Sequence, residues 1–322
     1  MTLTVVRTLR RVALAAAGAL ALGALPGAVG TSVASPPTAL AMLTDVGRGQ
    51  LATDRPVLAQ PRTGITAGDY TLPARADSGW RRVPGSVILA VASGGLTVRA
   101  AHGCGVASYP AGSAAVLTAG EYLIAAEQLT RFGGVVLGLT GPARPTIGEL
   151  PGAPDRCGTS GRGGLTVGQV GRATFVDASG YHMPQMHEHH LQQAQPGRLT
   201  ARGGRDIGIE FVRIAAGSSL GWHTHPGPAL ILVEHGTIDY WTDHDGTCTN
   251  VGHYTTGDAY VVQPYPGHRH VAYVSDAGQG FVVYLDLPAT FRWVPMLGMA
   301  LDGNDFTPLP PPGCPTLRDN HL

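Results

Sequence analysis

The chain has 322 residues, and its 22 basic and 22 acidic side chains give a formal net charge of zero, without any basic stripe. This balance argues against nucleic acid as a partner. The 46 glycines and 25 prolines punctuate short apolar runs, which favours an all-β fold. The length suits two domains of modest size after an N-terminal leader.

Residues 1–34 have the pattern of a secretory signal. An arginine-containing start precedes an apolar run from Val12 to Leu25, and small residues follow up to Ala34. The run is short for a membrane span, so we expect cleavage after Ala34 or after Gly30 and no stable membrane span afterwards. The pair Arg10-Arg11 leaves twin-arginine export open beside the general secretory route. Either route predicts a secreted or extracytoplasmic protein.

Residues 35–70 show no sustained hydrophobic periodicity. Proline, glycine and threonine are frequent, and we expect an N-terminal arm with at most a strand or two.

Residues 71–160 repeat a stretch found later in the chain. The segment from Gly79 to Gly94 matches the segment from Gly221 to Gly236 at a constant offset of 142 residues, sharing Gly-Trp, Pro-Gly and an apolar run. Such a repeat predicts two copies of one structural unit. A helix over 121–131 is the competing local interpretation, and the repeat favours a strand there.

The first copy lacks the histidines of the second. Arg81 and Val83 stand where the later copy has His223 and His225. Farther on, the segment Gly120-Glu-Tyr-Leu123 aligns with Gly267-His-Arg-His270, so a third histidine is missing as well.

Residues 161–205 form a predicted linker that contains a histidine-dense patch, His187, His189 and His190. The patch is either a secondary metal site or an exposed polar loop. We favour the loop, because a tract without fixed strand geometry cannot preorganise its ligands.

Residues 206–290 carry the chemistry-bearing pattern. His223 and His225 are two residues apart, so on a β-strand both side chains point to one face. His270 arrives on a later strand. Three imidazoles that converge inside a sheet predict a metal site.

These two stretches resemble the signature motifs of the cupins. The first motif matches at Gly217, His223, His225 and Gly236, but its glutamate is replaced by Ala229. The second motif matches at Gly257, Gly267 and His270, whereas Gln263 and Val274 stand where a proline and an asparagine are expected.

The resemblance implies two tandem cupin barrels of jelly-roll type, spanning 71–160 and 206–290, of which the first is degenerate and holds no metal. In the second barrel it implies one divalent transition metal, Fe, Mn or Zn, bound by His223, His225 and His270. Gln263, Tyr260 and Tyr240 are candidates for the shell around the metal. An oxalate-decarboxylase-like activity is disfavoured, because it would need the carboxylate that Ala229 replaces.

The chain has four cysteines, which allow three pairings. The repeat selects Cys104–Cys157 and Cys248–Cys314, one bridge in each copy. Export is consistent with disulfides. The second bridge would tie down a proline-rich C-terminal tail, residues 291–322.

Two functional hypotheses follow. The first is a metal-dependent protein with small-molecule, oxygenase-type chemistry. The second is a non-enzymatic extracellular module that binds a metal or a small ligand. Whether the protein is an enzyme stays open at this point, as does assembly into a homo-oligomer.

Overall fold

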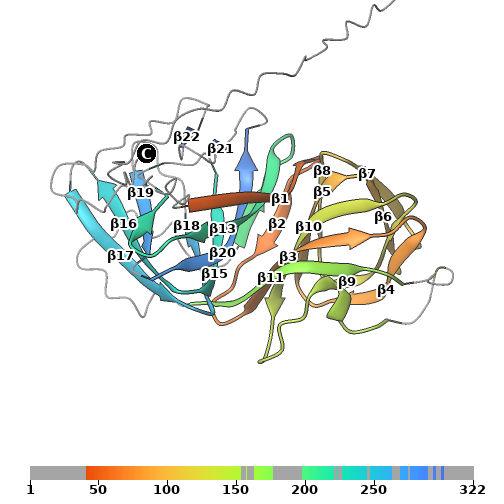
Figure 1. Ribbon diagram of the computed structural model, residues 1–322. Coiled ribbons are helices and arrows are strands. Elements are labelled where there is room, and N and C mark those ends of the chain that lie inside the picture. The colour runs from red at the N-terminus through yellow and green to blue at the C-terminus, as the bar shows by residue number, and fades with distance from the viewer. Residues whose placement is uncertain are drawn as a thin grey trace, which may run out of the picture. The chain divides into compact units, whose positions relative to one another are not determined.

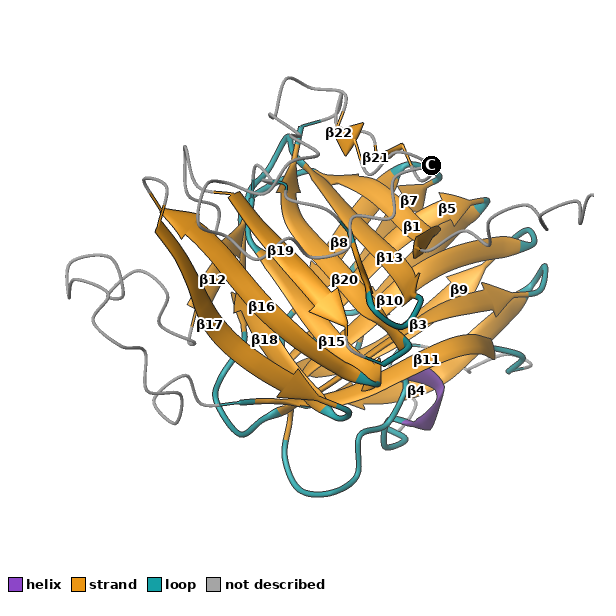
Figure 2. Cartoon of the chain, turned by 60° about the vertical axis from the view of Figure 1, so that its left-hand side comes forward, coloured by secondary structure: helices purple, strands orange, loops and turns teal. Residues whose placement is uncertain are grey.

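The computed structural model describes residues 41–153, 157, 163–176, 198–220, 223, 227–244, 247–262, 269–274, 276–288, 293–294 and 299–300. Most of these residues lie in strands (Figure 2), with one short 3-10 helix, η1 (Ile147–Glu149), in the described part of the chain. Residues 39–322 form one compact unit. The predicted all-β class is confirmed.

Ten strands close into a ring that both copies share. Around the ring they follow the order β1 (Ala41–Leu51), β13 (Asp206–Ile214), β20 (Gly278–Leu287), β15 (Ala229–His235), β18 (Asp258–Val262), β11 (Thr166–Phe175), β3 (Gly64–Leu72), β10 (Thr130–Leu139), β5 (Ser86–Ser93) and β8 (Ser113–Leu117).

Each half of the ring has its own four-stranded sheet. The first sheet has the order β4 (Ala76–Val83), β9 (Gly120–Ala126), β6 (Gly95–Ala100) and β7 (Val106–Pro110). The second has the order β14 (Ser218–Ser219), β19 (Arg269–Val274), β16 (Thr237–His244) and β17 (Thr247–Thr255). Figure 1 shows these two sheets with the ring strands between them. Short pairs join β2 (Arg55–Leu58) to β12 (Arg198–Ala201) and β21 (Trp293–Val294) to β22 (Met299–Ala300).

Three hydrophobic clusters follow from strand alternation. In β5, Ile88 and Ala90 point into the ring, whereas Val87, Leu89 and Val91 point toward the first four-stranded sheet. Alternate side chains of a strand face opposite sides, so a strand buried on both faces needs a continuous apolar run. This explains why the repeated apolar segments show no polar alternation.

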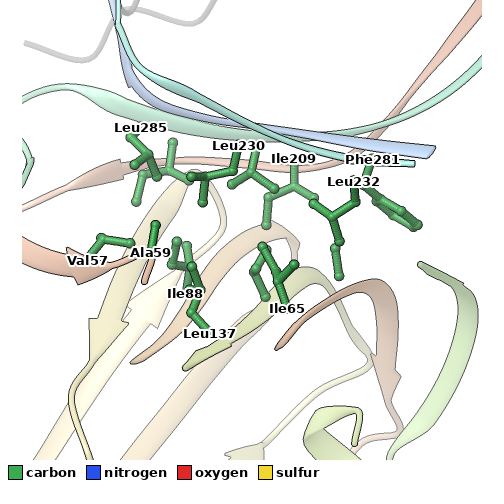
Figure 3. Packing of buried hydrophobic residues seen from close by; sticks show 14 of the residues in the cluster. Val57, Ala59, Ile65, Ile88, Leu137, Ile209, Leu230, Leu232, Phe281 and Leu285 are labelled. Atoms are coloured by element: carbon green, nitrogen blue, oxygen red, sulfur yellow. The ribbon is translucent and has the colours of Figure 1, made fainter. Parts of the chain in front are cut away.

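The ring interior joins the two copies. Leu230, Leu232 and Phe281 of the second half face Ile65 and Leu137 of the first half (Figure 3). The side chains between ring and four-stranded sheet form one core in the first barrel and another in the second. The two-barrel arrangement is the one that the cupin resemblance implies.

The first strand of each copy crosses to the other copy. β1 precedes the first barrel in sequence but pairs antiparallel with β13 of the second. β11 precedes the second barrel but pairs antiparallel with β3 of the first. The segment expected to be an arm with at most a strand or two therefore contains β1, β2 and most of β3. It is an integral part of the ring.

Equivalent glycines turn the chain in both copies. Gly94 lies between β5 and β6 with φ of 78°, and Gly236 lies between β15 and β16 with φ of 88°. A Cβ on Gly236 would lie 2.6 Å from the carbonyl oxygen of Ala277. Only glycine adopts this backbone conformation without strain and tolerates that approach.

Candidate metal centre

The structure describes the predicted metal ligands only in part. His223 is buried, with 7% of its surface exposed. His270 lies in β19, and its side chain is outside the described residues, as are His225, Gln263 and the patch His187, His189 and His190. Among the described side chains, no three His, Cys, Asp or Glu residues form a metal-binding group. The histidine triad thus stays a prediction.

The backbone register shows where position 270 lies. Residue 270 pairs with Thr242 of β16, and Val274, four residues farther along β19, pairs with Ile238. Val274 and Ile238 belong to the core of the second barrel. Residues of even separation share a face of a strand, so position 270 is on the core side of β19.

Tyrosines line the core of the second barrel. The ring of Tyr260 stacks on that of Tyr254 with a centroid distance of 3.7 Å, and it lies 5.8 Å from the ring of Tyr240. Tyr284 of β20 is 2% exposed. The Tyr260 hydroxyl is buried and has no hydrogen-bond partner in the part of the chain that is described. Burial raises the pKa of this phenol well above its usual value, so it is a donor at neutral pH.

The first barrel has smaller side chains at three of the matching positions. The strand registers match Tyr240 with Val98, Tyr260 with Ala115 and Tyr284 with Val136, whereas Tyr254 matches another tyrosine, Tyr109. Three phenols have therefore replaced three aliphatic side chains in one copy of the same frame. Phenol oxygens inside a core usually find a hydrogen-bond partner, and among these tyrosines the Tyr260 hydroxyl is the buried oxygen without a described one.

Ala229 occupies the place of the cupin glutamate. It is 1% exposed, and its strand neighbours are Tyr284 and Val262. No carboxylate is present at this position, as the sequence requires. Sequence reasoning missed Tyr284. It lies in an apolar run 148 residues after Val136, and the strand register identifies it as the counterpart of that residue.

The first barrel has an arginine at its equivalent site. Arg81 shares a strand face with Val83, and its Nε donates to the Ser78 carbonyl at 2.7 Å while Nη1 donates to the Leu150 carbonyl at 3.0 Å. Leu150 and Ile147 from the η1 segment pack into the core of this barrel. The guanidinium thus satisfies backbone acceptors without any bound ligand.

One sequence alignment is corrected by the register. Tyr122 pairs with Ala100 in the first barrel as His270 pairs with Thr242 in the second. The first-barrel counterpart of His270 is therefore Tyr122 and not Leu123. The sequence alignment was wrong by one residue because the loops before these strands differ in length. The expected strand over this region is confirmed by β9.

Cys104 and Cys157 form a disulfide with a Cα–Cα distance of 5.4 Å. This is the pairing that the repeat predicts for the first copy. Cys248 is also disulfide-bonded, whereas its predicted partner Cys314 lies outside the described residues. In the described part of the chain, no helix is long and apolar enough to cross a membrane.

Comparison with known proteins gives structural neighbours only. No family model and no curated protein matches the chain. Oxalate decarboxylase from Bacillus subtilis matches with a TM-score of 0.31 and 13% identity over 76% of each chain. A cupin 2 conserved barrel domain protein from Leptotrichia buccalis matches with a TM-score of 0.25 and 13% identity, over 76% of this chain and 91% of that one. These scores carry no argument about function.

Proposed function

We propose that the second barrel binds one divalent transition metal through His223, His225 and His270, and that a small ligand binds beside it. The observation that carries the proposal is the contrast between two copies of one frame. Where the first barrel has Arg81 and three aliphatic core residues, the second has buried His223 and three tyrosines.

The register of the first barrel supports a position of His223 directly opposite His270. Arg81 pairs directly with Tyr122 across β4 and β9. His223 and His270 are their counterparts, so the same register in the second barrel would set the two histidines opposite each other. Directly opposite residues have Cβ atoms about 4.5–5.5 Å apart, which suits two ligands of one ion.

The donor set fits a first-row transition metal. Neutral imidazoles suit Fe and Zn better than Mn, which prefers oxygen ligands, and without the glutamate they leave the full charge of the cation in the site. When bound, such an ion would supply Lewis-acid chemistry or oxygen-dependent chemistry. Tyr240 and Tyr260 supply phenol groups to the same core as Ala229, which stands where the cupin motif has a carboxylate.

Metal analysis of the full secreted chain tests the proposal. We expect one equivalent of metal in the wild type and none in His223→Ala/His270→Ala. His253→Ala is the matched control, because His253 is exposed on β17 and pairs with Asp239 at 2.7 Å. If the double variant keeps its metal, the triad is not the site, and the patch at His187, His189 and His190 becomes the next candidate.

A non-enzymatic binding module is the second candidate function, favoured by the replacement of the cupin glutamate by Ala229. The two functions differ in turnover. An enzyme with iron or manganese would consume oxygen with a small substrate, whereas a binding module would retain the ligand unchanged. Zinc would direct the assays to hydrolysis.

We further propose that the protein works outside the cytoplasm. The Cys104–Cys157 disulfide is compatible with an oxidising compartment. N-terminal sequencing of protein from the extracellular fraction tests this, with a start near residue 35 expected and an intact Met1 contradicting it.

A further inference from the structure

Glu210 is a carboxyl group inside the second barrel. Its neighbours Ile209 and Phe211 point into the shared ring, whereas Val212 and Ile214 belong to the core of the second barrel. Strand alternation therefore puts Glu210 on the barrel side, directly opposite Val282 of β20. Its Oε2 is closed to solvent and has no hydrogen-bond partner among the described residues.

A second carboxyl group, that of Asp45, lies opposite Glu210 on the neighbouring strand β1. Asp45 of β1 is the direct partner of Glu210 in the register. Arg48, the nearby cation, donates from Nε to Asp206 at 2.7 Å and from Nη2 to the Pro288 carbonyl at 2.8 Å. Burial, and then the charge of Asp45, raise the pKa of Glu210 to about 8, against the opposing effect of Arg48.

The first barrel lacks both carboxyl groups. The pair that corresponds to Asp45 and Glu210 is Val170 and Gly68, directly opposite each other across β11 and β3. Burying a carboxyl group without a partner costs several kcal/mol in general. The duplicated frame thus folds without a carboxyl group at this position, and because Asp45 is exposed, the cost in the second copy falls on Glu210 alone. Such a cost is typical of a functional site.

Glu210 shares one row of the sheet with Tyr260. The cross-strand partners run from Glu210 through Val282 and Ile231 to Tyr260. A cavity of about 40 Å³ is lined in part by Val282, Ile231 and Tyr260. The polar groups at the two ends of this row, the Oε2 of Glu210 and the hydroxyl of Tyr260, both lack described protein partners. A ligand bound over Val282 and Ile231 would supply hydrogen-bond partners to both groups.

We propose that Glu210 is the proton-exchanging residue of the second barrel. Its Oε2 gives a proton to a basic atom of the bound ligand and takes the proton back when the ligand leaves, while burial and, to a lesser extent, the charge of Asp45 keep that proton on Glu210 in the free protein. No oxidant or reductant takes part in this step. The proposal rests on the ligand site proposed above, and it assigns an acid–base group that the sequence motif lacks.

Azide binding to the full chain loaded with Co²⁺ tests the proposal. In the wild type, we expect the azide affinity to fall about tenfold for each pH unit above the Glu210 pKa, because azide would bind only with the protonated carboxyl group. The azide affinity of Glu210→Gln should not fall with pH in this way. In Asp45→Asn the fall should begin at a lower pH. Glu234→Gln is the matched control, because Glu234 also has a buried Oε2 but lies on the opposite face of β15 from Val233.

Deprotonation of metal-bound water would affect all variants alike. The decisive quantity is therefore the difference between the wild type and Glu210→Gln in how azide affinity depends on pH. Identical pH profiles for the wild type and Glu210→Gln would overturn the inference even if the metal binds as proposed.

A second measurement needs no metal. Infrared difference spectra of the metal-free chain at pH 7 should show one protonated carboxyl group in the wild type that is missing in Glu210→Gln. Absence of that signal would overturn the inference. If His223→Ala/His270→Ala keeps its metal while the infrared signal is present, the proposed metal site fails and the protonated Glu210 remains.

Discussion

Nη1 of Arg81 donates a hydrogen bond of 3.0 Å to the carbonyl oxygen of Leu150. The arginine stands at the position that His223 occupies in the second barrel, and Leu150 comes from the segment after η1 that packs into the first core. A permanent cation with backbone acceptors therefore stands at the first-barrel position that corresponds to a predicted metal ligand of the second barrel. In the first barrel, the hydrogen bonds to the carbonyls of Ser78 and Leu150 give the Arg81 guanidinium protein partners.

Arg81→Ala should destabilise the protein without changing its metal content. The variant leaves the carbonyls of Ser78 and Leu150 without their charged donor, which costs about 2–3 kcal/mol of unfolding free energy. Denaturant unfolding measures this. Arg82→Ala is the control, because Arg82 is exposed and its ion pair with Glu121 at 3.1 Å should contribute less than about 1 kcal/mol. Loss of metal in Arg81→Ala would place the metal in the first barrel instead.

Histidines introduced into the first barrel should test the register. We expect Arg81→His/Val83→His/Tyr122→His to bind one additional equivalent of metal, because these positions correspond to His223, His225 and His270. The same variant with Leu123→His in place of Tyr122→His should bind none, since position 123 faces the other side of β9. Elemental analysis distinguishes the two. Equal binding by both variants would contradict the corrected register.

The barrels could be predicted from the sequence because their signals are local. Gly94 and Gly236 mark turns that only glycine allows, and the apolar runs before them form strands buried on both faces. The exchange of β1 and β11 could not be predicted. β1 contains Asp45 and Arg48 and shows no clear alternation, because its polar side chains pair across the seam with residues more than a hundred positions away.

The sequence predicts three histidine ligands and, around them, Tyr240 and Tyr260, which lie in the core of the second barrel, whereas Tyr284 and Glu210 could not be predicted. Tyr284 and Glu210 lie in apolar runs of β20 and β13, where sequence patterns indicate core side chains and give no sign that the two strands are neighbours. Their relation appears only when the cross-strand registers are known. The predicted ligands belong to two motifs with fixed spacing, which the sequence shows directly.

Tyr260→Phe should stabilise the metal-free protein while weakening ligand binding. The phenol oxygen is buried without a described partner, so its removal relieves a desolvation cost of about 1–3 kcal/mol. The control is Tyr254→Phe, whose ring stacks on that of Tyr260. Thermal unfolding without metal and azide titration with Co²⁺ measure the two effects. A destabilised Tyr260→Phe would show that the hydroxyl has a structural partner.

Glu210→Gln should change how stability depends on pH. The folded-state pKa of Glu210 is raised from 4.5 to about 8, so the folded protein holds this proton over a range where the unfolded chain has lost it. The wild type therefore loses stability as the pH rises from about 4.5 to about 8. The glutamine variant avoids this loss, and its advantage should grow over that window to on the order of a few kcal/mol. Urea unfolding at several pH values measures the difference.

The control for this titration is Glu127→Gln, because Glu127 is exposed in the turn between β9 and β10. Its unfolding free energy should stay parallel to that of the wild type at every pH. Parallel curves for Glu210→Gln and the wild type would mean that Glu210 ionises in the folded protein as it does in the unfolded chain. Glu210 would then carry its charge at neutral pH and repel an anionic ligand from the second barrel.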